Sequence, residues 1–228
     1  TGVPSQTRLP EETRKLLSRL AGLEELHLAI ISGRGFRELT DLVPLENATL
    51  AGNHGLKIRF ESGSTYEPEI AEEIHGAIAD FKVDVQEHFG GKEGIIIEDK
   101  GFGLGLHYRQ FRGDQEKVKE NFRKIWKRHE MSALEVIEGA KLMEVRPNNW
   151  NKGDAVRLLQ EEWDEVPTIY IGDDTTDEDA FEVLQKQEFG FPVLVSQFEN
   201  EESRAQYRLT NPKEVKGFLK DLYQLFQG

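Results

Sequence analysis

The sequence of 228 residues contains no cysteine. Disulfide bonds, thiolate nucleophiles and cysteine-ligated zinc sites are therefore excluded, and we expect a reducing compartment such as the cytoplasm. No apolar run approaches the roughly 20 residues that a membrane-spanning helix needs. The first residues lack the basic start and apolar stretch of a signal peptide. Zinc-binding patterns such as His-x-x-x-His are also missing.

Positive charge is scarce, with 29 Lys and Arg against 42 Asp and Glu and a net charge of −13. A chain of this sign is not expected to bind nucleic acid through a broad basic face, nor to bind an anionic membrane. An anionic substrate would need a metal ion or a local basic cluster to reverse the sign. The length fits one large domain, or a core with a smaller inserted domain.

The outer parts of the chain alternate strand and helix. Periodicity and capping residues predict helices over 10–20, 36–42, 152–163, 177–184 and 212–226. Apolar or alternating runs predict strands over 26–31, 49–51, 56–60, 168–171 and 192–195. This alternation predicts an α/β fold with a Rossmann-like parallel-sheet core, formed by residues 1–65 and 144–228.

The middle of the chain has a different order of elements. It predicts a helix over 68–89, a strand pair over 94–98 and 103–109, a helix over 115–128, and strands over 134–137 and 142–145. Residues 66–143 are therefore expected to form an inserted α/β domain.

Three carboxylates, Asp173, Asp174 and Asp177, follow the predicted strand over 168–171. Ligands of open α/β sheets lie beyond the carboxyl ends of the strands, and Mg²⁺ prefers a few carboxylates together with water and phosphate oxygens. Asp177 and Glu178 could simply stabilise a helix N-terminus. That interpretation does not account for two aspartates directly after a buried strand, so the motif favours a magnesium site.

Two further segments could bind phosphate. Ser32-Gly33-Arg34 offers a hydroxyl and backbone N–H groups ahead of a predicted helix. A plain strand-to-helix turn accounts for it about equally well. Lys152 begins another predicted helix and could neutralise a phosphate or an aspartyl phosphate. Taken alone, an exposed lysine at a helix start is the simpler interpretation.

The predicted inserted domain and the strand that follows it carry a mixed set of charges. Lys100, His107 and Arg109 lie on or beside neighbouring predicted strands, and Glu144 and Arg146 end the last one. Arg109, Glu144 and Arg146 alternate with apolar neighbours, so they could share one face of a sheet. Such a face can bind sugar hydroxyls and an anion. Without further context, a solvated face with ion pairs is the default.

These motifs, in this order, resemble the haloacid-dehalogenase superfamily of phosphohydrolases, and within it the trehalose-6-phosphate phosphatase family. The most specific stretch is Gly172-Asp173-Asp174-Thr175-Thr176-Asp177-Glu178-Asp179-Ala180-Phe181. The other family-like segments are Ile31-Ser32-Gly33-Arg34, Gly52-Asn53-His54-Gly55, Asp99-Lys100-Gly101, His107-Tyr108-Arg109, Glu144-Val145-Arg146-Pro147 and Asn151-Lys152-Gly153. The resemblance runs over nearly the whole chain.

The resemblance implies a catalytic role for several residues of the core. Ser32 would hold the transferring phosphoryl group by hydrogen bonding, and Lys152 would neutralise the phosphate and the nucleophile. Asp173 would be a direct Mg²⁺ ligand. Asp174 and Asp177 would bind the metal through water or orient Lys152.

The resemblance also implies a substrate-binding set. The core side of the cleft would be lined by Gly33, Arg34, Gly52, Asn53 and His54. The inserted domain would be a cap whose sugar contacts come from Lys100, His107, Arg109, Glu144, Arg146 and Asn149.

The family's first strand is not found in this sequence. In the family that strand carries two aspartates two apart, followed by Gly-Thr; the first is the nucleophile and the second the general acid and base. No such motif occurs in the 228 residues, and Thr1 begins about where that loop should end. We expect the missing strand upstream of Thr1.

The expected activity is hydrolysis of trehalose 6-phosphate to trehalose and phosphate through an aspartyl-phosphate intermediate. Two alternatives stay open. One is a phosphatase for another glycosyl phosphate. The other is an inactive sugar-phosphate-binding or regulatory domain of a trehalose-phosphate synthase-like protein, and a synthase would then be a partner.

Overall fold

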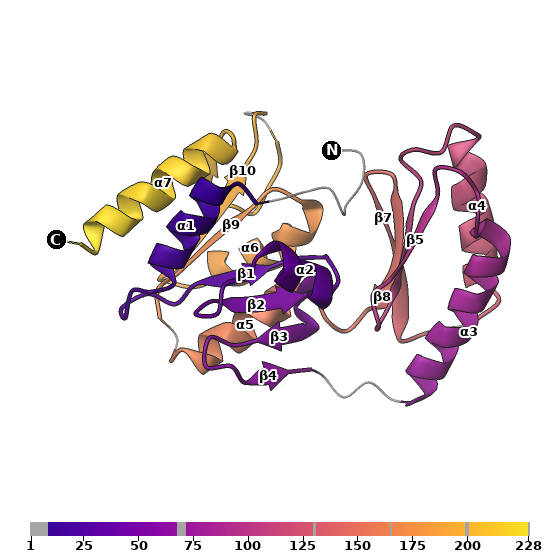
Figure 1. Cartoon of the computed structure of the whole chain (residues 1–228), viewed down its shortest axis with the longest axis horizontal. Helices are drawn as coiled ribbons and strands as arrows, with labels where there is room; N and C mark the ends of the chain where they lie inside the picture. The colour runs from indigo at the N-terminus through magenta and orange to yellow at the C-terminus, as the bar shows by residue number, and fades with distance from the viewer. Residues whose placement is uncertain (1–8, 68–71, 130, 165, 199–200, 228) are drawn as a thin grey trace. The chain divides into compact units, whose positions relative to one another are not determined.

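The structure is a computed structural model that describes residues 9–67, 72–129, 131–164, 166–198 and 201–227 (Figure 1). The chain divides into two compact units, and the smaller contains Pro68–Asn149. The larger, called the core unit below, joins Arg8–Glu67 to Trp150–Gly228. The predicted boundary between residues 143 and 144 falls within a strand, and the units instead divide after Asn149.

The core unit contains two sheets. One has the order β1 (Ala29–Ile31), β2 (Thr49–Gly52), β3 (Lys57–Arg59) and β4 (Thr65–Tyr66), with β1 and β2 parallel and β2 to β4 antiparallel. The other has the order β11 (Tyr207–Leu209), β10 (Gly190–Val195) and β9 (Thr168–Gly172), all parallel.

Helices cover both faces of these strands. They are α1 (Glu11–Leu20), α2 (Phe36–Leu42), α5 (Lys152–Glu162), α6 (Glu178–Gln185) and α7 (Pro212–Leu225). Successive residues of β1 face opposite sides, as a pleated strand requires: Ile30 packs in the cluster that includes Leu17 of α1, and Ile31 packs with the residues of α5. Helices α1 and α7 lie side by side (Figure 1). Lys220 Nζ lies 3.0 Å from Glu12 Oε1.

Strands β1 and β9 each present an open edge. Strand β1 bonds to β2 through the peptide groups of Leu28 and Ser32, so those of Ala29 and Ile31 point to the other side. Strand β9 bonds to β10 through Thr168 in the same way. No strand within the described ranges pairs with either outer edge. Among the described residues, each sheet of the core unit therefore ends on an edge without a partner strand.

The Pro68–Asn149 unit is an antiparallel sheet with two helices on one face (Figure 1). Its strands are β5 (Ile96–Asp99), β6 (Leu104–His107), β8 (Leu142–Pro147) and β7 (Leu134–Gly139), in that spatial order. The helices are α3 (Glu72–Phe89) and α4 (Gln115–Trp126). Phe81 of α3 meets Phe122 and Trp126 of α4 edge-on, with ring centroids 5.5 and 5.7 Å apart.

The α/β class and the parallel character of the core are confirmed. Every predicted helix is present, although residues 68–71 of the helix predicted over 68–89 lie outside the described residues. The three-residue strand β11 was not predicted, because Gln206, Tyr207 and Arg208 form no apolar run. Its pairing with β10 defines it.

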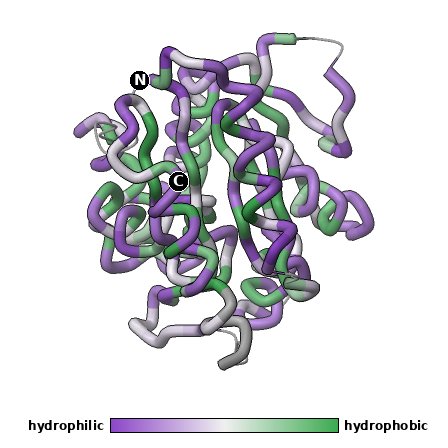
Figure 2. Tube along the Cα trace, turned by 90° about the vertical axis from the view of Figure 1, so that its right-hand side faces the viewer, coloured by the Kyte–Doolittle hydropathy of each residue, from purple (hydrophilic) through white to green (hydrophobic). Residues whose placement is uncertain are grey.

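Hydrophobic and hydrophilic residues are interspersed along the coloured part of the trace in Figure 2. Within the described ranges, no helix combines the length and the apolar character that crossing a bilayer requires.

The aromatic contact between α3 and α4 predicts a large effect of one substitution. Phe81 is fully buried, so Phe81→Ala should lower the free energy of unfolding of the Pro68–Asn149 unit by about 3–5 kcal/mol. Urea unfolding followed by the fluorescence of Trp126 measures it. Val83→Ala on the same helix is the control, because Val83 is 55% exposed and should change stability by less than about 0.5 kcal/mol. Equal effects of the two variants would contradict the packing described.

Candidate active site

A buried carboxylate, that of Asp177, organises the carboxyl end of β9. Its Oδ1 accepts from Lys152 Nζ at 2.7 Å and from the Tyr170 hydroxyl at 2.6 Å. Its Oδ2 accepts from the backbone N–H groups of Asp173 and Asp174 at 3.0 and 2.9 Å. Two donors on each oxygen match the acceptor capacity of a carboxylate. This arrangement suits the predicted role of Asp177 in orienting Lys152 better than a role as a metal ligand.

The local sequence makes room for this carboxylate. A Cβ added to Gly172 would lie 2.4–2.6 Å from side-chain atoms of Asp177, so only glycine lets Asp177 fold back against the strand. The turn η3 (Thr175–Asp177) is closed by a capping box between Asp174 and Asp177. The side chains of Asp174 and Asp177 therefore stabilise the backbone of the turn in which they lie.

Lys152 is held at the first position of α5. The Asn151 side chain caps the helix by accepting from the N–H groups of Gly153 and Asp154 at 2.8 and 3.2 Å. In return, the Asp154 carboxylate accepts from the backbone N–H of Asn151 at 2.9 Å. A cation at a helix N-terminus is unfavourable for the helix dipole. Lys152 is nevertheless only 6% exposed. The interpretation of Lys152 as an exposed helix-start lysine is wrong, because its ammonium is buried against Asp177.

The pKa values of Asp177 and Asp173 are shifted in opposite directions. Burial, the largest effect, would raise the pKa of Asp177, but the charge and hydrogen bond of Lys152 and the Tyr170 hydroxyl hold that pKa below its usual value. Desolvation and the negative charges of Asp177 and Asp174 raise the pKa of Asp173. Asp173 therefore sits in a surplus of negative charge.

Asp173 and Asp174 are both exposed at the end of β9. In the described part of the chain, no three His, Cys, Asp or Glu side chains are grouped so as to hold a metal ion by themselves. Mg²⁺ commonly takes only one or two carboxylates and completes its shell with water and substrate phosphate. The excess negative charge at Asp173 fits a cation, so these two residues are suitable magnesium ligands.

The segment Ser32-Gly33-Arg34 follows β1 and forms a second part of the core site. Ser32 Oγ accepts from Arg34 N at 3.2 Å, and Arg34 makes an ion pair with Glu38 on α2. The backbone of Ser32 and Arg34 accepts from His54 N and Asn53 N at 2.9 and 2.7 Å. The structure thus brings together two of the predicted segments.

The segment Gly52-Asn53-His54-Gly55 supports the loop that contains Gly33. Asn53 and His54 have φ of 52° and 58°, a left-handed conformation that is unusual for residues with a Cβ. His54 is buried, and its ring lies where a Cβ on Gly33 would be only 2.7 Å away. His54 therefore acts as a platform under the Ser32 loop.

Helix α5 adjoins both parts of the core site. Ala155, three residues after Lys152, lies so close to Gly55 that a Cβ on Gly55 would be 2.3 Å from the Ala155 methyl. On its other side, Gly153 approaches the backbone of Asp179 in α6. The first turn of α5 therefore connects the Ser32 loop with the acidic motif.

The remaining candidates belong to the Pro68–Asn149 unit, on the sheet face opposite its helices. Lys100 Nζ lies 2.8 Å from Glu144 Oε1, and both side chains are less than one tenth exposed. Arg146 Nε donates to Glu135 Oε1 at 3.0 Å. Lys100, Glu144 and Arg146 are therefore ion-paired and largely buried, whereas the Glu135 side chain is 42% exposed.

Three other predicted residues are placed differently. His107 Nε2 is 2.8 Å from Glu98 Oε2, so the histidine is paired within the sheet. Arg109 is exposed and donates to Ala140 O at the far turn of the sheet, which separates it from Glu144 and Arg146. Asn149 is exposed at the end of the unit.

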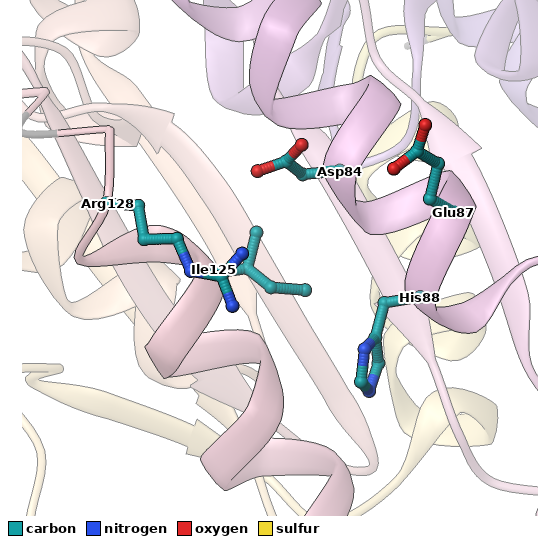
Figure 3. Close-up of a pocket in the computed structure, with 5 residues that line it drawn as sticks. All are labelled: Asp84, Glu87, His88, Ile125 and Arg128. Carbon is teal, nitrogen blue, oxygen red and sulfur yellow. The ribbon is translucent and has the colours of Figure 1, made fainter.

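A pocket of about 200 Å³ lies elsewhere in the same unit, between α3 and α4 (Figure 3). It is lined by Asp84, Glu87, His88, Ile125 and Arg128. Asp84 is already engaged by His129 at 3.0 Å. This pocket contains none of the residues that the sequence predicted for the site.

Two residues that contact the predicted site residues were not predicted from the sequence. Tyr170 was predicted only as part of an apolar strand, and Glu98 only as a strand end. Their spacing could have indicated these contacts, because residues two apart on a strand share one face. Tyr170 lies two residues before Gly172, and Glu98 lies two residues before Lys100.

The family model for trehalose-phosphatase matches residues 2–213. The chain belongs to the trehalose-phosphatase family. Trehalose 6-phosphate phosphatase RA3 of Zea mays is 32% identical over 238 residues, covering 96% of this chain and 64% of that protein. Probable trehalose-phosphate phosphatase G of Arabidopsis thaliana is 36% identical over 220 residues, covering 85% of this chain and 58% of that protein. The chain spans less than two thirds of either plant relative.

The fold of this trehalose-phosphatase family member also matches a solved structure. A trehalose-6-phosphate phosphatase related protein superposes with a TM-score of 0.82 at 22% identity, covering 99% of this chain and 92% of that chain. This likeness supports the fold described above.

The contact between Gly33 and His54 predicts a loss of stability on adding one methyl group. Gly33→Ala should cost about 1–3 kcal/mol of the free energy of unfolding, because the new Cβ meets the buried imidazole. The double variant Gly33→Ala, His54→Ala should recover part of that loss by making room. Gly22→Ala is the control, since its Cβ would have ordinary contacts. Chemical denaturation measures all three, and an unchanged Gly33→Ala would rule out the platform role.

The raised pKa of Asp173 predicts that removing its charge increases the stability of the protein in a pH-dependent way. A folded-state pKa above the unfolded value means that stability falls as the pH rises through the folded value. Asp173→Asn, which carries no charge, should therefore have a higher melting temperature than the natural protein at pH 7 in metal-free buffer. The difference should vanish below about pH 4. The exposed Asp41→Asn should show no such gain, and a lower melting temperature for Asp173→Asn would contradict the assignment.

Proposed function

We propose that this chain is the phosphate- and metal-binding part of a Mg²⁺-dependent phosphatase that hydrolyses trehalose 6-phosphate to trehalose and phosphate. The buried Lys152–Asp177 pair beside two exposed aspartates carries this proposal, in a chain of the trehalose-phosphatase family. Helix stability does not account for a buried lysine at a helix N-terminus or for the two exposed aspartates, whereas a bound anion and a bound cation would account for both.

Each core residue has a distinct role in the proposal. Lys152 supplies the positive charge that meets the phosphoryl group, and Asp177 fixes the direction of that ammonium. The Ser32 hydroxyl and the backbone of the Ser32-Gly33-Arg34 turn would donate to phosphate oxygens. Preoriented charges of this kind stabilise phosphoryl transfer mainly through electrostatics.

Asp173 and Asp174 would hold Mg²⁺. When bound, the ion would neutralise phosphate charge. The chain's own contribution is the turn η3, which presents both carboxylates on a backbone fixed by Asp177.

The nucleophile of the proposed reaction is an aspartate outside these 228 residues. The open edges of β1 and β9 support this, since Ile31 of β1 and Tyr170 of β9 pack on the same cluster of α5 and α6. A parallel strand pairing with both edges would end beside the Ser32 loop and Asp173, because carboxyl ends of parallel strands meet at one edge of a sheet.

The sugar would be bound by the polar face of the Pro68–Asn149 unit. Lys100, Glu144 and Arg146 offer donors and acceptors whose positions are fixed by ion pairs. Sugar hydroxyls need both kinds of partner. Arg109 is a weaker candidate because it lies at the other end of the sheet.

A second candidate function is binding without hydrolysis, as in a regulatory domain that would associate with a trehalose-phosphate synthase. The sequence favours it to the extent that no Asp-x-Asp-Gly-Thr motif occurs in the 228 residues. A cytoplasmic location is likewise a proposal, consistent with the lack of cysteine.

The proposal predicts a strong dependence on Lys152. In the protein that includes the nucleophile strand, Lys152→Met should lower phosphate release from trehalose 6-phosphate by about 10²–10³-fold, as loss of a single charge-stabilising donor does elsewhere. Removing Mg²⁺ with EDTA should abolish release. Lys186→Met, at the residue that follows α6, is the control, because Lys186 is exposed and its ion-pair partner among the described residues is Glu182.

A panel of sugar phosphates, assayed for released inorganic phosphate, separates the candidates. Activity on sucrose phosphate but not on trehalose 6-phosphate would overturn the substrate. Tight binding of trehalose 6-phosphate with no release would favour the regulatory domain.

A further inference from the structure

Tyr170 contacts Asp177, the central carboxylate of the proposed phosphate site. It is on β9, and its hydroxyl donates to Asp177 Oδ1 at 2.6 Å, the same oxygen that accepts from Lys152 Nζ at 2.7 Å. Its ring meets Phe181 of α6 edge-on, with centroids 5.8 Å apart. Burial, and then the charge of Asp177, raise the pKa of Tyr170, so the hydroxyl stays protonated and donates.

The two donors to Asp177 Oδ1 differ in rigidity. Lys152 reaches it through a four-carbon side chain, which has more rotatable bonds than the side chain of tyrosine. Tyr170 reaches it from a sheet strand through a ring packed against Phe181. Tyr170 is therefore the more rigid donor, and it limits where the shared oxygen can lie.

The other oxygen of the Asp177 carboxylate is also held by hydrogen bonds. Its Oδ2 is held by the N–H groups of Asp173 and Asp174. With Oδ2 held from the turn and Oδ1 from the strand, the carboxylate plane cannot rotate. Without the hydroxyl, Oδ1 would keep Lys152 as its one described donor, and the pair could shift together.

We propose that Tyr170 is a positioning residue of the phosphate site, which acts through Asp177 to fix the Lys152 ammonium where the phosphoryl group binds. This inference rests on the proposed function for the identity of the ligand. Tyr170 acts through Asp177 and not on the substrate, because its hydroxyl donates to Asp177 Oδ1 and its ring packs in the apolar cluster of α5 and α6.

Ligand affinities of Tyr170→Phe test the inference, since that variant keeps the ring and removes the hydroxyl. Isothermal titration calorimetry with inorganic phosphate and with trehalose 6-phosphate, each in Mg²⁺, should show Kd raised about tenfold for both, the usual size of a hydrogen bond to a charged group. The Kd for trehalose, which has no phosphate, should be unchanged. A tyrosine of purely structural importance would not produce this split.

The matched control is Thr168→Val on the same strand. It removes a hydroxyl that is hydrogen-bonded to Gln160 and Val166 and does not contact Asp177. Thr168→Val should change the Kd for phosphate by less than twofold. An equal loss in Thr168→Val and Tyr170→Phe would overturn the inference, because it would show a general effect of weakening β9.

A double-mutant cycle tests whether the effect passes through Asp177. In an Asp177→Asn background, Tyr170→Phe should change the Kd for phosphate by less than twofold. A further tenfold loss there would overturn the inference. If Asp177→Asn does not fold, the comparison with Thr168→Val decides.

The outcomes are distinguishable from failure of the proposed function. No binding of phosphate or trehalose 6-phosphate by the natural protein would refute the proposed function. Binding by the natural protein with an unchanged Kd in Tyr170→Phe would refute only the role of Tyr170.

Discussion

The structure of the candidate site depends on the buried ion pair between Lys152 and Asp177. Removing two charges from water costs several kcal/mol per ion, and their attraction offsets this only when every remaining hydrogen-bonding position is filled. Asp177 meets that condition with four donors. A pair of this kind adds little to stability over a well-packed apolar contact, so its presence at the end of a sheet points to binding.

Several close backbone approaches in the core unit surround this pair. Gly172 leaves space for the Asp177 carboxylate. Gly153 lets the start of α5, which carries Lys152, lie close to α6. Gly55 lets the same helix turn meet the loop behind β2, where His54 adopts a left-handed conformation and supports Gly33. One helix start thus connects the cationic, the acidic and the hydroxyl-bearing parts of the site.

Local patterns predicted the helices and the acidic turn, because periodicity and a strand end followed by carboxylates are visible in a few neighbouring residues. Helix α2 was predicted with its observed bounds. Burial of Lys152 was not predictable in this way, since it depends on Asp177, 25 residues away. Pairing of His107 with Glu98 and the separation of Arg109 from Arg146 depend on sheet order and turn position. Those are set by packing, which one strand does not encode.

We have proposed that Ser32, Lys152 and the acidic turn bind one phosphate and one divalent cation. Anomalous diffraction from crystals soaked with tungstate and Mn²⁺, which replace phosphate and Mg²⁺, tests this proposal. We expect a tungsten peak within hydrogen-bonding distance of Lys152 Nζ and Ser32 Oγ, and a manganese peak beside Asp173 and Asp174. Peaks confined to other surfaces, with the Lys152–Asp177 pair unchanged and no density beside it, would refute the proposed site.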